Sequence, residues 1–401
     1  MRTGTILCRG GSPHIVPLTL VPFVADRRLV VISDYQGGSA YGSPAPSVEA
    51  FRAQQKNRRR RVSTQALQPR EVKVEGGYIE RLPLACLRTG LTDSVEVWTH
   101  WRGDDRPMDR VTDHGHIIRR AFRMNGPDAP FASNDMLAYV QEFGAPEILC
   151  VWGLGVCEEI MMACQSSLKI YNSIDAPALR IPPEISRHFD LVLTGAQWQS
   201  EVVRERHPHM KTAILPIGPE FASDTLFYPR GEEKSYDLVY VAAAQPYKRH
   251  DILFDALAAL PRSIRALCVM GYGEMGDALR KMAGALGIDV NFIGPPGVPI
   301  AEVNRLMNQA KIGVVCGVDD GAPAILTEYM LAGLPVLANN KLVCGLQYIN
   351  PRSGCSADAK DFPGTIVRML ENLSDFSPRD QVTANWTWEH SVQKLRELIL
   401  S

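Results

Sequence analysis

Residues 314–338 read VVCGVDDGAPAILTEYMLAGLPVLA, and this stretch decides the fold class. Apolar runs at Ile312–Cys316 and Pro335–Ala338 are typical of buried strands. Between them, Pro323–Ala332 has apolar residues at helical spacing, and its proline stands in the first turn, where a missing N–H has no partner to lose. A strand, a helix and a second strand in this order predict a parallel sheet covered by helices.

The same alternation extends over most of the chain. Short loops rich in Gly and Pro separate the expected strands and helices from about residue 145 onward. Two α/β domains that face each other across a cleft are therefore expected. Further strands are predicted at Ile148–Trp152, Leu168–Tyr171, Leu191–Thr194, Ala213–Pro216, Tyr236–Ala244, Ala266–Gly271 and Val290–Gly294.

The first 145 residues have a weaker pattern. Strands are predicted at Thr5–Cys8 and Leu29–Ser33. Glu71–Leu82 resembles a β-hairpin that turns at Gly76–Gly77.

A segment with several prolines and glycines follows the last strand predicted in the middle of the chain. It runs from Pro216 to Glu233, shows little periodicity, and is expected to link the two domains. We therefore place an N-terminal domain at 1–216 and a C-terminal domain at 217–385. A last helix within 386–401 is expected to pack back toward the first domain.

Composition limits the classes of function. The chain has 401 residues, enough for about two domains with a core each. Its 43 Lys and Arg balance 44 Asp and Glu, and the net charge of -1 argues against general nucleic-acid binding. No apolar run reaches the ~18 residues of a membrane-spanning helix. Nine scattered cysteines without a CxxC pair, and a start too quickly polar for a signal peptide, favour a cytoplasmic protein.

Two carboxylates frame the helix predicted at 323–332. Asp320 precedes it, and Glu328 lies on its apolar stripe, where an unsatisfied carboxylate is costly. The helical rise of ~1.5 Å per residue separates them by roughly 12 Å, about the span from the ribose of a sugar nucleotide to its sugar. Glu328 is therefore expected to hold the ribose, and Asp320 the sugar. The alternative is an N-cap aspartate and a glutamate paired with a cation inside the core.

A second loop indicates the same chemistry. Lys248 and Arg249 follow the strand predicted at Tyr236–Ala244 and stand directly before a helix. Ligands of parallel sheets bind beyond the carboxyl ends of the strands, and a cation there can neutralise a diphosphate leaving group. The alternative is an ordinary solvated loop lysine.

These motifs, in this order, resemble the retaining nucleotide-sugar glycosyltransferases of the GT-B fold. The large family 4 of these enzymes includes sucrose synthases and phosphatidylinositol mannosyltransferases. The family has an acidic residue and a glutamate separated by seven residues, and these two correspond to Asp320 and Glu328. The family's lysine corresponds to Lys248. Its V-x-G-x-G turn and its strand ending in F-x-G resemble Val269–Gly273 and Phe292–Gly294. The resemblance covers about residues 145–400.

The resemblance implies two Rossmann-like parallel-sheet domains, with the acceptor side at 1–216 and the nucleotide-sugar-binding domain at 217–385. It implies an enzyme that moves a sugar from a nucleotide diphosphate donor to an acceptor hydroxyl. It implies retained anomeric configuration, no cofactor and no obligatory metal, in glycan, glycolipid or glycoside biosynthesis. Asp320 and Lys248 are the implied catalytic residues. The implied donor-binding residues are Glu328, Arg249, Gly10, Gly11, Gly271, Gly273, Ile293, Gly321, Ala322, Pro323 and Ala324, and His14 and Asp175 are candidate contacts to the sugar or the acceptor.

Three positions depart from the family pattern. Asp320 replaces the usual first glutamate, which shortens the reach of the carboxylate by one methylene group. The family arginine before the lysine falls on Ala242 or Ala243, where Arg249 is a candidate replacement. The cleft histidine of the family falls on Ile174. The missing arginine and histidine leave open a catalytically degenerate GT-B subunit that binds a sugar nucleotide. A GT-B epimerase or phosphorylase is the alternative enzyme.

A run of four consecutive arginines, at positions 58–61, stands apart from these motifs. It indicates either a solvated loop or peripheral contact with a phosphorylated acceptor or with the anionic inner face of a membrane. The histidine pairs at 114 and 116 and at 207 and 209 lack a carboxylate or cysteine at metal-ligand spacing, so no metal site is predicted. The residues of the basic run are Arg58, Arg59, Arg60 and Arg61.

Overall fold

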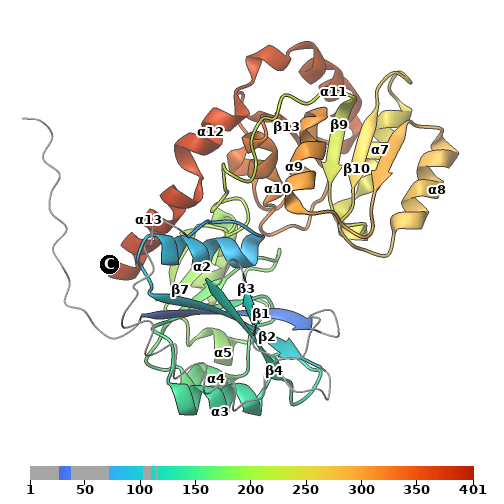
Figure 1. Cartoon of the computed structure of the whole chain (residues 1–401). Helices are drawn as coiled ribbons and strands as arrows, with labels where there is room; N and C mark the ends of the chain where they lie inside the picture. Colours follow the sequence, from blue (N-terminus) through green and yellow to red (C-terminus); the bar gives the residue numbers. More distant parts are fainter. Residues whose placement is uncertain (1–26, 38–71, 103–109, 113–115) are drawn as a thin grey trace, which may run out of the picture.

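The computed structural model describes residues 27–37, 72–102, 110–112 and 116–401. Two α/β domains lie one above the other, each built around its own sheet (Figure 1). This confirms the pair of parallel-sheet domains predicted from the sequence.

The N-terminal sheet has the strand order β3-β4-β2-β1-β5-β6-β7-β8. Among its described strands, only β3 runs antiparallel to its neighbour. The strands are β1 (Arg28–Gly37), β2 (Ser94–Trp101), β3 (Arg110–Thr112), β4 (Ile117–Arg123), β5 (Ile148–Trp152), β6 (Leu168–Asn172), β7 (Leu191–Thr194) and β8 (Lys211–Ile214). The helices are α2 (Tyr78–Arg88), α3 (Asn134–Phe143), α4 (Glu158–Ala163), α5 (Pro183–Ser186) and α6 (Gln197–Arg206).

The C-terminal sheet is parallel, with the order β11-β10-β9-β12-β13-β14. Its strands are β9 (Tyr236–Val241), β10 (Ala266–Val269), β11 (Val290–Ile293), β12 (Ala310–Val315), β13 (Val336–Asn339) and β14 (Gly354–Ala357). The helices are α7 (His250–Ala258), α8 (Gly276–Leu286), α9 (Ile300–Asn308), α10 (Ile325–Leu331), α11 (Phe362–Glu371), α12 (Pro378–Asn385) and α13 (Trp388–Leu400).

Alternate residues of the central strands enter two different cores. Leu29 and Val31 of β1 pack in the core that contains α2 and α13. Val30 and Ile32 face the opposite core, under α3 and α4. Burial on both faces explains why β5, with all five residues buried, is a continuous apolar run in the sequence.

The β-hairpin predicted at Glu71–Leu82 is wrong. Gly77 instead caps the N-terminus of α2, and Gly76 has a φ of +91°, in the region that favours glycine. Leu82 and Ala85 are buried one turn apart, which is helical rather than strand spacing. Because β1 and β2 are parallel neighbours, α2 is the crossover between them, and its N-terminus lies toward the carboxyl ends of the strands.

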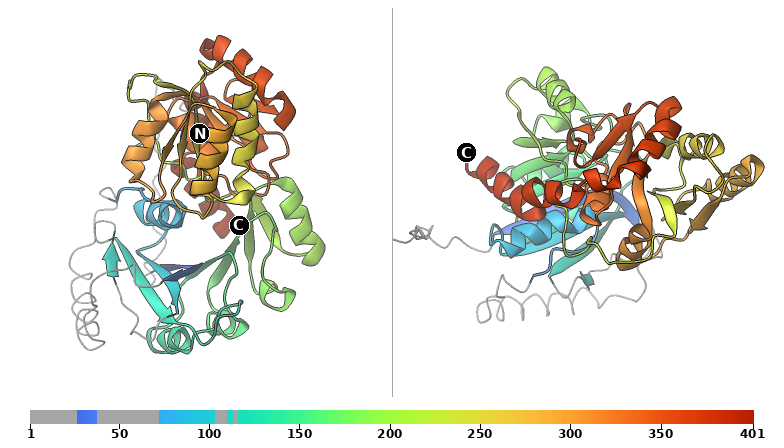
Figure 2. Two further views of the ribbon diagram at one scale, coloured as in Figure 1. Left: turned by 90° about the vertical axis from the view of Figure 1, so that its right-hand side faces the viewer. Right: turned by 90° about the horizontal axis from the view of Figure 1, so that it is seen from above.

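The C-terminal helix α13 lies beside α2 on the first domain (Figures 1 and 2). Arg396 of α13 donates a hydrogen bond to the carbonyl of Thr89 at 2.8 Å. Val392 and Leu395 are buried in the core that α2 shares. The chain therefore crosses between the domains twice, once after β8 and once before α13.

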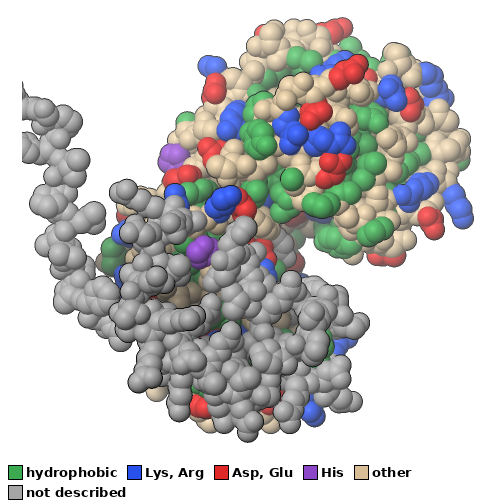
Figure 3. All heavy atoms as spheres, in the orientation of Figure 1, with side chains coloured by type: hydrophobic (Ala, Val, Ile, Leu, Met, Phe, Trp, Pro, Cys, Tyr) green, Lys and Arg blue, Asp and Glu red, His purple; other side chains and the backbone are tan. Residues whose placement is uncertain are grey.

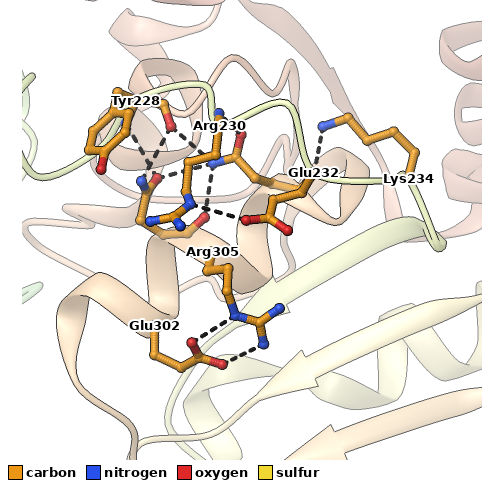
Figure 4. A network of polar contacts seen from close by, with 8 residues as sticks. Tyr228, Arg230, Glu232, Lys234, Glu302 and Arg305 are labelled. Atoms are coloured by element: carbon orange, nitrogen blue, oxygen red, sulfur yellow. Dashed lines mark hydrogen bonds and ion pairs between the residues drawn. The ribbon is translucent and has the colours of Figure 1, made fainter.

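The segment between the two sheets is fixed to α9 (Figure 4). Asn308 accepts a hydrogen bond from the backbone N–H of Arg230 at 2.7 Å and donates to the carbonyl of Tyr228 at 3.0 Å. The Lys234 ammonium donates to the carbonyl of Asn308 at 2.8 Å. These bonds hold α9 in place, and α9 begins beside the pocket described below.

A buried carboxylate lies at the junction of the domains. Glu220, 7% exposed, accepts hydrogen bonds from the hydroxyls of Tyr348 at 3.3 Å and of Ser391, on α13, at 3.5 Å. Burial raises the pKa of Glu220 to about 7, although Lys394 and the two hydroxyls act in the opposite direction.

This raised pKa predicts that stability falls as the pH rises. Between the usual glutamate pKa and about 7, the folded state keeps a proton that the unfolded state has lost. Glu220→Gln is expected to remove this pH dependence. The unfolding free energy of the variant should be about 1–2 kcal/mol larger than that of the wild type at pH 8, and nearly equal to it at pH 4. Urea unfolding followed by circular dichroism at both pH values measures this. Glu389→Gln, an exposed residue of α13, is the control, and a gain at pH 8 no larger than at pH 4 would contradict the expectation.

Candidate functional site

A pocket of about 500 Å³ lies between the domains, at the carboxyl ends of the C-terminal strands. Three charged residues from two motifs of the sequence line it together, namely Lys248, Asp320 and Glu328. Ile174 and Asp175 line it from the first domain. A second pocket, of about 640 Å³, lies by the start of β8 and the end of α13 and contains none of the predicted donor-binding residues.

Lys248 and Asp320 form a close ion pair in this pocket. The Lys248 ammonium donates a short hydrogen bond to Asp320 Oδ2, and the side chains are 18% and 15% exposed. Lys248 ends a 3₁₀ turn after β9, where the Tyr240 hydroxyl donates to its carbonyl at 2.5 Å. Asp320 Oδ1 accepts from the backbone N–H of Ala322 at 3.4 Å. The cation and the carboxylate are therefore fixed by two loops that follow neighbouring strands.

Glu328 forms an ion pair that crosses the cleft. Arg81 of α2 donates from Nη2 to Glu328 Oε1 at 2.6 Å, and the side chains are 2% and 13% exposed. Glu328 is thus paired with a cation, as the second interpretation expects, and it also lines the pocket. No local pattern singles out Arg81. The useful signal was the glycine pair at 76 and 77 followed by residues at helical spacing, which marks a helix N-terminus at the cleft.

The loop before α10 brings the domains together. A Cβ on Gly321 would lie 2.1 Å from the carbonyl oxygen of Asp175, so only glycine fits there. Ala322, Pro323 and Ala324 of this loop line the pocket. The helix itself begins at Ile325, two residues after the predicted start, and ends at Leu331.

The remaining wall of the pocket is mostly apolar. Val241 and Val269, at the ends of β9 and β10, line it together with Val298 and Val303 near the start of α9. Gly271 also lines the pocket.

Gly273 and Ile293 are not among the lining residues. Gly273 has a φ of +117°, and a Cβ there would lie 2.3 Å from the carbonyl oxygen of Ala244, which fixes the turn after β10 against the loop after β9. Ile293 ends β11 and is half-buried against the same core as Val269 and Val303.

Arg249 is not brought into the pocket. Its guanidinium instead bonds Asp251, with Nη2 to Oδ2 at 2.7 Å. Ala242 and Ala243, at the position of the family arginine, do line the pocket.

Asp175 lines the pocket, and its carboxylate pairs with Arg180 at 3.2 Å. The other predicted residues, Gly10, Gly11, His14, Arg58, Arg59, Arg60 and Arg61, lie outside the described residues.

Other features of the described residues give context to this pocket. Within the described ranges, no group of three or more His, Cys, Asp or Glu side chains is arranged to hold a metal ion. No helix there combines the length and the apolar character that crossing a membrane requires. On the face of the C-terminal domain seen in Figure 3, basic and acidic side chains are interspersed.

Comparison with known proteins finds a matching family model for part of the second domain. Residues 225–361 match the family model "Glycosyl transferases group 1". Among curated proteins, the chain is 24% identical over 179 residues to the GDP-mannose-dependent alpha-(1-6)-phosphatidylinositol monomannoside mannosyltransferase of Mycolicibacterium smegmatis (strain ATCC 700084 / mc(2)155). The match covers 40% of this chain and 47% of that enzyme, so it spans about half the length of the relative.

Solved structures give the fold of the whole chain. The sucrose-phosphate synthase of Thermosynechococcus elongatus has a TM-score of 0.62 at 15% identity, covering 93% of this chain and 98% of that one. HepE of Anabaena in complex with UDP and glucose has a TM-score of 0.62 at 13% identity, covering 93% and 99%. The pneumococcal O-GlcNAc transferase GtfA, in complex with UDP and GlcNAc, has a TM-score of 0.54 at 12% identity, covering 67% and 60%. The chain therefore has the GT-B fold predicted from its sequence, and residues 225–361 of its second domain resemble the glycosyl transferases group 1 family.

Proposed function

We propose that the chain transfers a sugar from a nucleotide diphosphate donor to an acceptor hydroxyl, with retention of the anomeric configuration. Lys248, Asp320 and Glu328 line one cleft pocket, and this placement supports the proposal most directly. Solved neighbours of the same fold hold UDP together with a sugar, and the curated relative is named for GDP-mannose. A nucleotide sugar is therefore the donor class that we assign to this pocket.

The donor is assigned an orientation along the pocket. The apolar wall formed by Val241, Val269 and Val298 suits the base, because the flat faces of its rings lose little hydration free energy when they pack on such a surface. Glu328 is assigned the ribose hydroxyls, and Lys248 the diphosphate. Asp320 is then left for the hydroxyls of the sugar, and the acceptor enters from the side of the first domain, where Asp175 lies.

The proposed reaction breaks the bond between the anomeric carbon and the diphosphate oxygen. The acceptor oxygen forms its new bond on the same face, and its proton passes to the departing phosphate oxygen. Negative charge grows on the diphosphate in the transition state, where a preorganised cation is most effective. Lys248 supplies that cation, so the proposal needs neither a cofactor nor a metal ion.

Glu328→Gln is expected to weaken binding of the nucleoside diphosphate about 10- to 100-fold, because a hydrogen bond to a charged group contributes about 1.5–3 kcal/mol. Calorimetric titration of UDP, GDP, ADP and TDP measures the loss and identifies the base. Glu302→Gln is the matched control, since Glu302 pairs with Arg305 on α9, away from the pocket. Equal affinities of wild type and the Glu328 variant would remove Glu328 from the donor site.

Lys248→Met is expected to lower kcat about 10²- to 10³-fold, because it removes charge stabilisation from the transition state. The assay follows transfer from the sugar nucleotide that binds, and NMR of the product gives the anomer. Lys281→Met, on the exposed face of α8, is the control. Activity is expected to persist in EDTA. An inverted product, or activity lost in EDTA and restored by a divalent cation, would contradict the proposed mechanism.

A further inference from the structure

The first turn of α2 is fixed to the sheet of its own domain. Glu80 Oε2 accepts a hydrogen bond from the backbone N–H of Gly77 at 2.9 Å. Its Oε1 accepts a short hydrogen bond from Arg119 of β4. Glu80 and Arg119 are 15% and 21% exposed, so the pair is largely shielded from water. The loop at Gly76 and Gly77 is therefore held in place independently of the second domain.

Arg81 follows Glu80 and points to the other domain. Its Nε donates to the carbonyl of Gly76 at 3.0 Å, while Nη2 donates to Glu328 at 2.6 Å. The guanidinium carbon lies 5.6 Å from the ring centre of Phe227. The side chain is 2% exposed, and within the described part of the chain its Nη1 has no hydrogen-bond partner. A cation this deeply buried is costly to desolvate, so a purely stabilising role is a poor explanation for it.

The bond to Arg81 also sets the orientation of the Glu328 carboxylate. Among the described residues, Arg81 is the one hydrogen-bond donor to this carboxylate, and it uses Oε1. Glu328 lines the pocket with 13% of its side chain exposed, so Oε2 is left to meet a ligand. A carboxylate held through one oxygen offers the other as a fixed acceptor, which lowers the entropy lost on binding.

We propose that Arg81 is a positioning residue for the ribose of the donor. It holds Glu328 through Oε1, so that Oε2 accepts a hydrogen bond from a ribose hydroxyl in the pocket. The inference rests on the proposed function, and it assigns to the N-terminal domain a part in recognising the nucleotide. It predicts that Arg81 matters for the ribose hydroxyls and not for the rest of the nucleotide.

The test compares ribose with a sugar that lacks its hydroxyls. UDP, GDP and ADP are titrated by calorimetry against wild type, Arg81→Met, Arg81→Lys and Glu328→Gln, together with their 2′,3′-dideoxy counterparts. Wild type is expected to bind one of these ribonucleotides, and to bind it about 10-fold or more tightly than its 2′,3′-dideoxy counterpart. Arg81→Met and Glu328→Gln are expected to reduce this preference to less than about threefold, with Arg81→Lys between them and wild type. Arg204→Met, an exposed arginine of α6, is the control.

The ratio of the affinities for the ribonucleotide and its dideoxy counterpart is insensitive to partial unfolding, because an inactive fraction changes both titrations alike. The double variant Arg81→Met, Glu328→Gln is expected to show no further loss of preference beyond Glu328→Gln alone. If Arg81→Met weakens both nucleotides equally, Arg81 only supports the fold and the inference is wrong. If Glu328→Gln loses the preference while both Arg81 variants keep it, the donor site stands and the role of Arg81 fails. If wild type binds none of the nucleotides, the proposed function fails first.

Discussion

The pocket depends on a contact between the two domains at the level of the backbone. Gly321 lies against Asp175, and a Cβ on Gly218 would lie 2.3 Å from the carbonyl oxygen of Ala322. These approaches bring the loop after β12 against the loop after β6, so that residues of both domains line a single space. A side chain at 321 or 218 would separate the domains or displace the loop that carries Asp320. The position of Asp320 relative to Asp175 therefore follows from this contact.

Much of this arrangement could be predicted from local sequence. β5 and β7 lie where the sequence predicts them, because strands buried on both faces leave continuous apolar runs between Gly- and Pro-rich loops. Lys248 and Asp320 each follow a strand of a parallel sheet, and the carboxyl ends of such strands meet at one edge. Local pattern and topology together were therefore enough to place these two side chains in one pocket.

Other features depend on contacts that no local pattern contains. The glycine pair before α2 suits a hairpin turn and a helix start equally, and only the spacing of Leu82 and Ala85 separates the two. Arg81 meets Glu328 across 247 positions of sequence, so the pair exists only once both domains have folded. Arg249 is expected in the pocket because it stands in the loop after β9. Its guanidinium instead pairs with Asp251, two residues later.

The two ion pairs of the pocket differ in how a ligand can use them. The Lys248–Asp320 pair is partly exposed, and a diphosphate offers Lys248 a partner of higher charge than one carboxylate. Once Lys248 binds the diphosphate, Asp320 is free to accept hydrogen bonds from sugar hydroxyls. Arg81 is too deeply buried to exchange partners in this way, because an unpaired buried charge costs about 3–5 kcal/mol. On the proposed function, the Lys248–Asp320 pair separates when the diphosphate and the sugar bind. The Arg81–Glu328 pair stays intact, and Glu328 binds the ribose.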